Sequence, residues 1–225
     1  MNKQITIILF FLLSTLCGYS QIKSGIVFGG GKGSISNVVF PDEQPLFIDL
    51  NGNVIENVHL QWFYKYKFDV TIGYKFRIEP QHRPFFYDID LNLGLKRFNT
   101  GYTSPLVSYI PEGVAEDDEM EYLFGASGHF QHTYYSFSVN PSWNYRLIKG
   151  LYAGAGIEPT LYHKAGTPSS EKWKFDLPLT AKVGYDLKFI DFSIIYKHGL
   201  FDTMEHEYLG SAKFRSWQLS VFIPF

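Results

Sequence analysis

The sequence predicts an all-β chain that closes into an eight-stranded antiparallel up-and-down transmembrane β-barrel. Three observations predict this fold. Segments in which apolar and polar residues alternate recur along the chain, as strands with two different faces require. The connections between these segments are alternately short and long. The composition is rich in aromatic residues, with 16 Tyr, 21 Phe and 4 Trp, although the mean hydropathy is near neutral. This balance is typical of membrane strands that are apolar on one side only.

The first residues are typical of a secretory signal peptide. Lys3 precedes an apolar run over residues 5–16, and the small residues Gly18 and Ser20 follow it. This run is too short to cross a bilayer as a helix. We therefore expect cleavage after Ser20.

Cleavage there divides the chain into a signal peptide, residues 1–20, and a barrel, residues 21–225. Cys17 opens a lipoprotein alternative, but Leu16 occupies the position where a small residue is needed before a lipidated cysteine. Without the signal peptide the chain has no cysteine, so no disulfide and no thiol chemistry are expected.

Eight segments are predicted as strands. They are residues 22–31, 66–79, 85–98, 131–147, 151–162, 175–188, 192–200 and 215–225. The second segment alternates most regularly: apolar residues from Tyr66 to Ile78 share one face, and charged or small residues from Lys67 to Glu79 share the other. Alternation over this length is a strong strand signal.

The connections predict which ends of the strands meet. Three of them are short and four are long. The short ones are 80–84, 148–150 and 189–191, and the long ones are 32–65, 99–130, 163–174 and 201–212. Short turns on one side and long loops on the other are the arrangement of outer-membrane barrels. With eight strands, both ends of the barrel chain lie on the side of the short turns.

The last strand alternates up to the final residue of the chain. Five apolar residues share one face, opposite Ser216, Gln218 and Ser220; the apolar set is Trp217, Leu219, Val221, Ile223 and Phe225. A chain that ends in this way resembles the small outer-membrane β-barrel family, which includes OmpX/OmpA-like and porin-family barrels.

That resemblance implies a location and a set of partners. The terminal Phe225 would be part of the signal that the barrel-insertion machinery reads. The chain would lie in outer-membrane lipid, with its termini in the periplasm and its long loops extracellular. Barrels of this kind serve as surface, adhesion or structural proteins, and some pass small solutes weakly.

Alternation alone leaves open which face points inward. A secreted barrel of the lipocalin type would turn its apolar face inward around a ligand. Eight strands, however, leave an interior just wide enough for side chains. The apolar face here is bulky, whereas the polar face is rich in glycine, as at Gly73, Gly94 and Gly184. The polar face therefore fits the interior better, and the apolar face is expected to contact lipid.

The charges predicted to point inward nearly cancel. The cations are Lys67, Lys75, Arg77, Lys96, Arg146, Lys182, Lys188 and Lys197, and the anions are Asp69, Glu79, Asp88, Asp90, Glu158, Asp176 and Asp186. In a narrow, poorly hydrated lumen, opposite charges are expected to form a paired network that plugs the barrel. The alternative is a gated polar conduit.

Three prolines interrupt the predicted wall. Pro141, Pro159 and Pro178 are expected at a similar height on the fourth, fifth and sixth strands. Proline cannot donate to a ladder and is unusual in a closed sheet. The first interpretation is a set of bulges that curve the wall. The alternative is a lateral opening toward the bilayer, which is similar to the entry of lipid into barrel enzymes of the PagP family.

Two long connections are candidates for contact with other molecules. Residues 46–56 contain Asn51-Gly52 between apolar runs, which predicts a β-hairpin. Were this hairpin part of the wall, the barrel would have ten strands; we expect eight. Residues 112–121 are rich in carboxylates. Among them Glu116, Asp117, Asp118 and Glu119 form a weak metal candidate, but they lack the ordered spacing of a calcium loop.

The sequence gives little support for an enzyme or for nucleic-acid binding. His129 and His132 lie close together without an evident third ligand, and Ser193 falls on the opposite face from His198. The Ser, His and Glu set of the PagL family of lipid A deacylases therefore has no counterpart here. A formal net charge of −2 does not indicate nucleic-acid binding, for which a basic surface is typical. We expect no cofactor and a non-enzymatic barrel; the alternatives are a lipid-modifying enzyme and a narrow solute pore.

Overall fold

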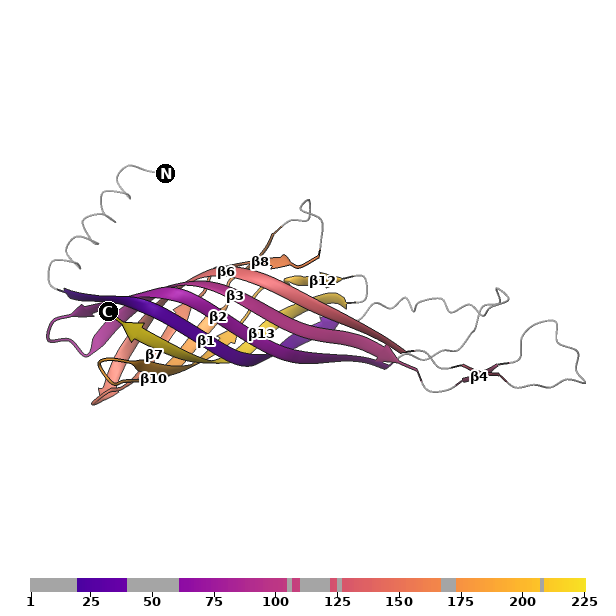
Figure 1. Ribbon diagram of the computed structural model, residues 1–225, viewed down its shortest axis with the longest axis horizontal. Helices are drawn as coiled ribbons and strands as arrows, with labels where there is room; N and C mark the ends of the chain where they lie inside the picture. Colours follow the sequence, from indigo (N-terminus) through magenta and orange to yellow (C-terminus); the bar gives the residue numbers. More distant parts are fainter. Residues whose placement is uncertain are drawn as a thin grey trace, which may run out of the picture.

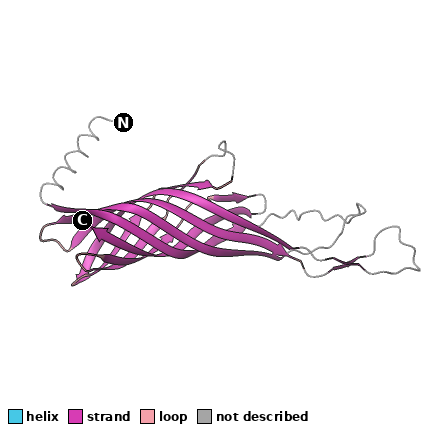
Figure 2. Ribbon diagram, viewed as in Figure 1, coloured by secondary structure: helices cyan, strands magenta, loops and turns pink. Residues whose placement is uncertain are grey.

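Antiparallel strands make up nearly all of the computed structural model, which describes residues 20–39, 61–104, 107–109, 122–124, 127–166, 173–206 and 209–225 (Figures 1 and 2). Within these residues no helix is long and apolar enough to span a membrane. Residues 1–19 of the predicted signal peptide, the hairpin at 46–56 and the acidic segment at 112–121 lie outside the described residues, so these three expectations remain predictions.

Long strands form most of the wall, and shorter ones complete it. The strands are β1 (Ser20–Val39), β2 (Gln61–Pro80), β3 (Phe85–Thr103), β4 (Val107–Tyr109), β5 (Tyr122–Phe124), β6 (Ser127–Ile148), β7 (Leu151–Ile157), β8 (Thr160–Lys164), β9 (Lys174–Asp176), β10 (Leu179–Asp186), β11 (Asp191–His198), β12 (Met204–His206) and β13 (Leu209–Pro224). The first three long strands and β6 extend further toward the long connections than the alternation alone predicted.

The strands form a closed ring. Neighbours pair antiparallel in the order β3-β2-β1-β13-β11-β10-β7-β6, and β3 pairs with β6 to close it. β8 and β9 continue the lines of β7 and β10 in the wall. The ring therefore has eight positions, which confirms the eight-stranded barrel and excludes the ten-stranded alternative. Closure matters because a sheet in hydrocarbon must have no unpaired edge.

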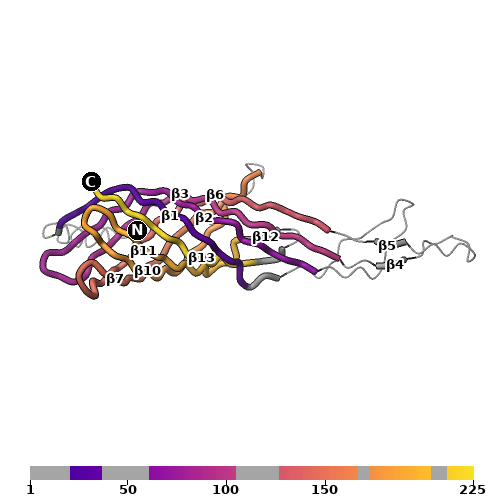
Figure 3. The backbone as a smooth tube through the Cα atoms, turned by 60° about the horizontal axis from the view of Figure 1, so that its bottom comes forward, coloured from indigo at the N-terminus to yellow at the C-terminus, as the bar shows by residue number. Residues whose placement is uncertain are grey.

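The first and last strands meet at a long seam. β1 pairs with β13 from Gly25 opposite Pro224 to Ser36 opposite Lys213. Beyond β13, the backbone N–H of Phe225 donates to the carbonyl oxygen of Ser24 at 2.9 Å. The C-terminus and the short turns lie at one end of the barrel, on the left of Figure 1, and Figure 3 shows the same arrangement from another side.

The outward face is apolar and the inward face is polar. On β13, Trp217 and Leu219 are 61% and 56% exposed, while Ser216, Gln218 and Ser220 between and beside them are buried. The same alternation follows β3, β6, β10 and β11. A surface of this kind is stable against hydrocarbon, so the barrel is a transmembrane one. The alternative in which the apolar face points inward, as in a lipocalin, is therefore wrong.

One predicted face is reversed, at the end of β2 near the long connections. Tyr66 pairs with Phe98 and Phe68 pairs with Arg97, so Lys67 between them has no partner in the ladder. This bulge turns Tyr66 into the lumen, where it is 5% exposed, and turns Lys67 outward. The expectation that Lys67 belongs to the lumen charges is therefore corrected. The physical reason is the extra residue, which shifts the alternation by one.

The three prolines fall where the pairing of the wall changes. Pro141 remains inside β6, whereas Pro159 lies between β7 and β8, and Pro178 lies between β9 and β10. The backbone continues across the breaks, since the N–H of Val139 donates to the Pro159 carbonyl at 3.1 Å and that of Glu158 to the Pro178 carbonyl at 2.8 Å. The prolines thus occupy neighbouring places on adjacent strands. A lateral opening there remains a prediction.

Candidate functional site: the charged lumen

The lumen is charged because the polar residues of each strand alternate inward. Two neighbouring strands contribute most of the charge: β2 supplies Asp69, Lys75 and Arg77, and β3 supplies Asp88 and Asp90. All five side chains are buried, with exposed fractions of 2% or less. Opposite charges on paired strands therefore face each other in a space closed to solvent.

Asp88 and Arg77 form the centre of this network. The guanidinium of Arg77 donates to both carboxylate oxygens of Asp88, from Nε at 2.8 Å and from Nη2 at 3.2 Å. Its Nη1 donates to Asp191 at 2.9 Å, across the lumen on β11. A two-pronged pair of this kind is directional as well as charge-assisted. It ties the β2–β3 wall to the opposite wall.

Two lysines complete the cluster around Asp88. Lys182 on β10 donates from Nζ to Asp88 at 2.8 Å and to the hydroxyl of Ser142 at 3.1 Å. Lys75 lies 3.6 Å from an oxygen of Asp88 and 3.6 Å from an oxygen of Asp90. The cluster therefore joins three cations to the buried carboxylates of Asp88, Asp90 and Asp191, so the formal charges of these six side chains balance. Buried charges need such compensation.

Aromatic rings surround the guanidinium of Arg77. Its Cζ lies 4.4 Å from the ring centre of Phe86, 5.3 Å from that of Phe222 and 5.5 Å from that of Tyr152. The hydroxyl of Tyr152 donates to Asp191 at 2.7 Å. Cation–π contacts strengthen when the cation is desolvated. The rings also occupy the space that water would need beside the charged cluster.

A second group of ion pairs lies nearer the long connections. Lys96 pairs with Asp69, and Lys197 pairs with Glu158 at 2.8 Å. The hydroxyl of Ser138 also donates to Glu158, at 2.9 Å. Lys96 in turn lies 5.4 Å from the ring centre of Phe214. Lys96 and Asp69 face each other on the paired strands β3 and β2, whereas Lys197 on β11 reaches past β10 to Glu158, which follows β7.

An apolar cluster adjoins this second group of ion pairs. Its members are buried inside the barrel and are Ile35, Tyr66, Phe98, Tyr134, Tyr162, Ala212 and Phe214. The rings of Phe98 and Tyr134 are stacked at 5.8 Å, and the ring of Tyr162 lies 5.0 Å from that of Phe214. The inward face thus changes from charged to aromatic along the barrel axis. Sequence alternation did not predict this second filling.

The remaining predicted charges lie at the edges of the lumen. Glu79 pairs with Arg146 at 2.9 Å and with Lys23 at 3.1 Å, near the short turns. Asp186 lies 3.6 Å from Arg77 at the same end. Lys188 is exposed in the turn after β10, where its φ of 73° is left-handed. The expectation that Lys188 points into the lumen is corrected, because the strand ends before it.

Asp176 has a different role from that expected. Its Oδ1 accepts the backbone N–H groups of Leu177, Leu200 and Phe201 at 2.8, 3.0 and 2.9 Å. No ion pair to Asp176 is found among the described residues. The carboxylate instead fixes two chain segments at the end of the barrel, and it compensates the interruption of the strand before Pro178.

Asp191 is the main lumen residue that sequence reasoning missed. The alternation predicts a short turn over residues 189–191, but Asp191 begins β11 and is 2% exposed. Period-two counting from Ser193 would have placed it on the inward face. Three aromatic side chains, those of Phe86, Tyr152 and Phe222, are also buried inside the barrel. Each lies on the inward face of its strand, next to polar residues that the alternation predicted to point inward.

Histidine and carboxylate side chains of the described residues are the candidates for metal binding. No group of three or more His, Cys, Asp or Glu side chains there could hold a metal ion. His132 contacts Thr100 at 2.7 Å and stacks on Phe98, which makes it part of the buried filling. The weak metal candidate at Glu116, Asp117, Asp118 and Glu119 lies outside the described residues.

Comparisons with known proteins give similar barrels at low identity. One solved structure is the attachment invasion locus protein Ail of Yersinia pestis, in complex with the heparin analogue sucrose octasulfate; it is 11% identical, with a TM-score of 0.38, over 91% of this chain and 99% of that one. Another is Neisserial surface protein A (NspA), 12% identical with a TM-score of 0.38, over 91% of this chain and 97% of that one. No protein-family model matches the sequence, and no curated protein does.

Proposed function

We propose that this chain is a non-enzymatic outer-membrane barrel with a surface, adhesion or structural role, and that buried ion pairs plug its lumen. The observation that carries the proposal is the charge-balanced cluster around Asp88, which joins opposite walls through Arg77 and Lys182. Side chains that bridge the lumen in this way leave the barrel wall and its long connections as the parts that meet other molecules.

The proposal includes an orientation and three kinds of partner. The termini and short turns face the periplasm, and the long connections face the cell exterior, where the first two, residues 32–65 and 99–130, meet an extracellular partner. Outer-membrane lipid surrounds the apolar belt. The barrel-insertion machinery recognises the C-terminal strand, whose last residue, Phe225, is 76% exposed and contacts Tyr74.

Planar-bilayer recordings test the plug against the narrow-pore alternative. Purified, refolded protein should add no stepwise conductance, because charged and aromatic side chains fill the lumen at different heights. A steady ohmic conductance in every insertion would contradict the proposal and favour the pore.

Protease treatment of intact cells tests the surface role. Cleavage should fall only within the long connections, and mass spectrometry of the fragments would map the sites. Cleavage confined to the turns at 80–84, 148–150 and 187–190 would reverse the orientation and overturn the surface role. The lipid-modifying alternative is tested separately, by mass spectrometry of lipid A from cells with and without the protein; unchanged lipid A is expected.

A further inference from the structure

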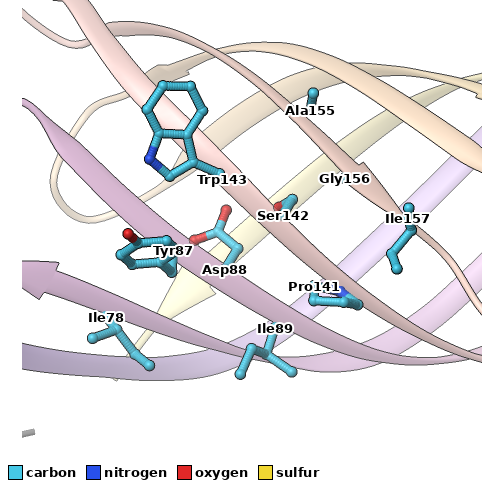
Figure 4. A pocket seen from close by; sticks show the side chains of 10 residues that line it. All are labelled: Ile78, Tyr87, Asp88, Ile89, Pro141, Ser142, Trp143, Ala155, Gly156 and Ile157. Carbon is cyan, nitrogen blue, oxygen red and sulfur yellow. The ribbon is translucent and has the colours of Figure 1, made fainter. Parts of the chain in front are cut away.

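An apolar groove lies on the outer wall beside the first of the three prolines. Its volume is about 480 Å³, and it runs over β3, β6 and β7. Figure 4 shows its lining, which includes the outward side chains of Tyr87, Ile89, Pro141, Trp143, Ala155 and Ile157. The groove faces away from the lumen, within the belt of apolar residues that surrounds the barrel.

The register of the strands explains why the wall is hollow at this point. Pro141 lies opposite Ile89, and Ala155 lies opposite Trp143, which in turn lies opposite Tyr87. The short side chains Pro141 and Ala155 are thus flanked by long ones. Larger side chains at positions 141 and 155 would fill this hollow, as the large outward side chains do along most of β13.

Buried polar residues form the floor of the groove. Asp88 and Ser142 contribute to it, but their side chains are buried and hydrogen-bond to Lys182 on the lumen side. The central ion-pair cluster therefore lies directly behind the groove and holds the floor in place. A molecule in the groove meets an apolar surface, because the polar side chains of the floor are buried.

Position along the barrel indicates which leaflet the groove faces. Pro141 is separated from the end of β6 at Ile148 by fewer than the 9–11 residues that a strand needs to cross a bilayer. Trp143 and Tyr145 lie between them on the outward face, with ring centres 6.4 Å apart. Such rings prefer the headgroup level. The groove is thus open to acyl chains that descend from the leaflet on the short-turn side.

We propose that this groove binds one acyl chain of a phospholipid from that leaflet, so that the barrel carries a specific lipid in addition to the lipids around its belt. The apolar lining, the location within the hydrocarbon-facing surface and the adjacent aromatic pair all match an acyl chain whose headgroup lies near the short turns. The proposal is independent of the surface role, and it requires no opening of the wall.

Photolabelling in vesicles tests the proposal. Wild-type protein is reconstituted with phosphatidylcholine that carries a diazirine in one acyl chain, and labelled peptides are mapped by mass spectrometry. Labelling should concentrate on the groove segments, residues 87–89 and 155–157, relative to the outward residues Ile194 and Leu219 on the far wall. Even labelling around the belt would overturn the proposal.

Two alanines on the outward face provide a matched pair of variants. Ala155→Phe places a ring in the groove and should reduce labelling of the groove segments to the level of the belt. Ala181 pairs with Ala155 across β7 and β10, is also exposed, and lies outside the groove lining. Ala181→Phe should therefore leave the groove labelling unchanged. Equal effects of both variants would contradict a specific site.

Correct assembly of each variant is checked by its resistance to unfolding on unheated gels. Should Ala155→Phe fail to assemble, Ile89→Phe fills the groove from β3 and is expected to give the same loss. Undiminished groove labelling in an assembled groove-filling variant would refute the proposal.

Discussion

Asp88 is the carboxylate that the buried cations of the central cluster share as a counter-ion. It contacts three cations, Arg77, Lys182 and Lys75. Because all four side chains are buried, the protein around them screens the interaction poorly. Loss of the carboxylate would leave excess positive charge in the lumen.

Asp88→Asn should therefore destabilise the barrel strongly. We expect a loss of about 3–5 kcal/mol in the free energy of unfolding, as for other buried pairs that lose one partner. Urea titration of protein in lipid vesicles, followed by tryptophan fluorescence, measures this change.

Glu79→Gln is the matched control, because Glu79 also pairs with two cations but lies at the partly open rim. Its expected cost is about 0–1 kcal/mol. Equal costs for the two variants would show that burial of the central cluster does not matter for stability.

Two adjacent glycines of β1 differ sharply in their surroundings. A Cβ on Gly31 would collide with the backbone carbonyl of Trp217 across the seam, whereas a Cβ on Gly30 would meet no atom within 4 Å. The close approach of β1 and β13 therefore requires glycine at position 31 and not at position 30.

Gly31→Ala should weaken the seam by about 1–3 kcal/mol, the usual cost of overpacking. Gly30→Ala should be neutral or stabilise the strand by up to about 1 kcal/mol, since glycine in a strand interior is unfavourable. Vesicle unfolding curves of the two variants decide this; a larger loss for Gly30→Ala would contradict the register of β1 on β13.

At the level of strands, alternation predicted the ring but could not predict its irregularities. The residues from Tyr66 to Asp69 alternate without interruption in the sequence, yet the structure inserts a bulge at Lys67. The bulge allows Tyr66 to stack with Phe98 at 6.3 Å inside the barrel. Packing between distant strands decides this local choice, and no pattern within one strand contains that information.

The sequence predicts which charged residues point into the lumen, but it does not predict which of them pair with each other. Period-two counting placed Arg77, Asp88 and Lys182 on inward faces, but their contacts depend on the register and on which strands lie opposite. Asp191 and Asp176 show the limit most clearly: one belongs to the central cluster, and the other holds backbone N–H groups. Both roles depend on the ends of strands, which a periodic pattern defines least well.

Deletion of Lys67 tests the bulge directly. Because Lys67 has no partner in the ladder, its removal should leave the faces of both halves of β2 unchanged, and the barrel should still assemble. Deletion of Ile72 in the regular part of the same strand should prevent assembly, because a one-residue slip turns every following side chain to the other face. Gel mobility with and without heating reports assembly. Failure of the Lys67 deletion with intact expression would refute the bulge.

At the scale of the whole molecule, the lumen is filled at two heights by different means. Ion pairs around Asp88 occupy one level, and the aromatic cluster that contains Phe98 and Phe214 occupies another. The two fillings share few residues, so neither depends on the other to close the lumen.

The Asp88→Asn barrel should therefore remain non-conducting in planar bilayers even though it is less stable. Continuous conductance from this variant alone would show that the aromatic cluster does not close the lumen. Additional truncation of Phe214 to alanine, which opens the second level, should be needed before ions pass.

The central claim is that apolar side chains face hydrocarbon while charged and polar ones face a closed interior. Nitroxide scanning of β13 tests it most directly: residues 216–221 are replaced singly by cysteine in protein without its signal peptide, labelled, and reconstituted in vesicles. We expect nitroxides on the outward face to collide readily with oxygen and rarely with a water-soluble nickel chelate; these labels replace Trp217, Leu219 and Val221. Nitroxides on the inward face should be shielded from both reagents; these labels replace Ser216, Gln218 and Ser220. Oxygen access at the serine and glutamine positions, with nickel access at the apolar ones, would contradict the account.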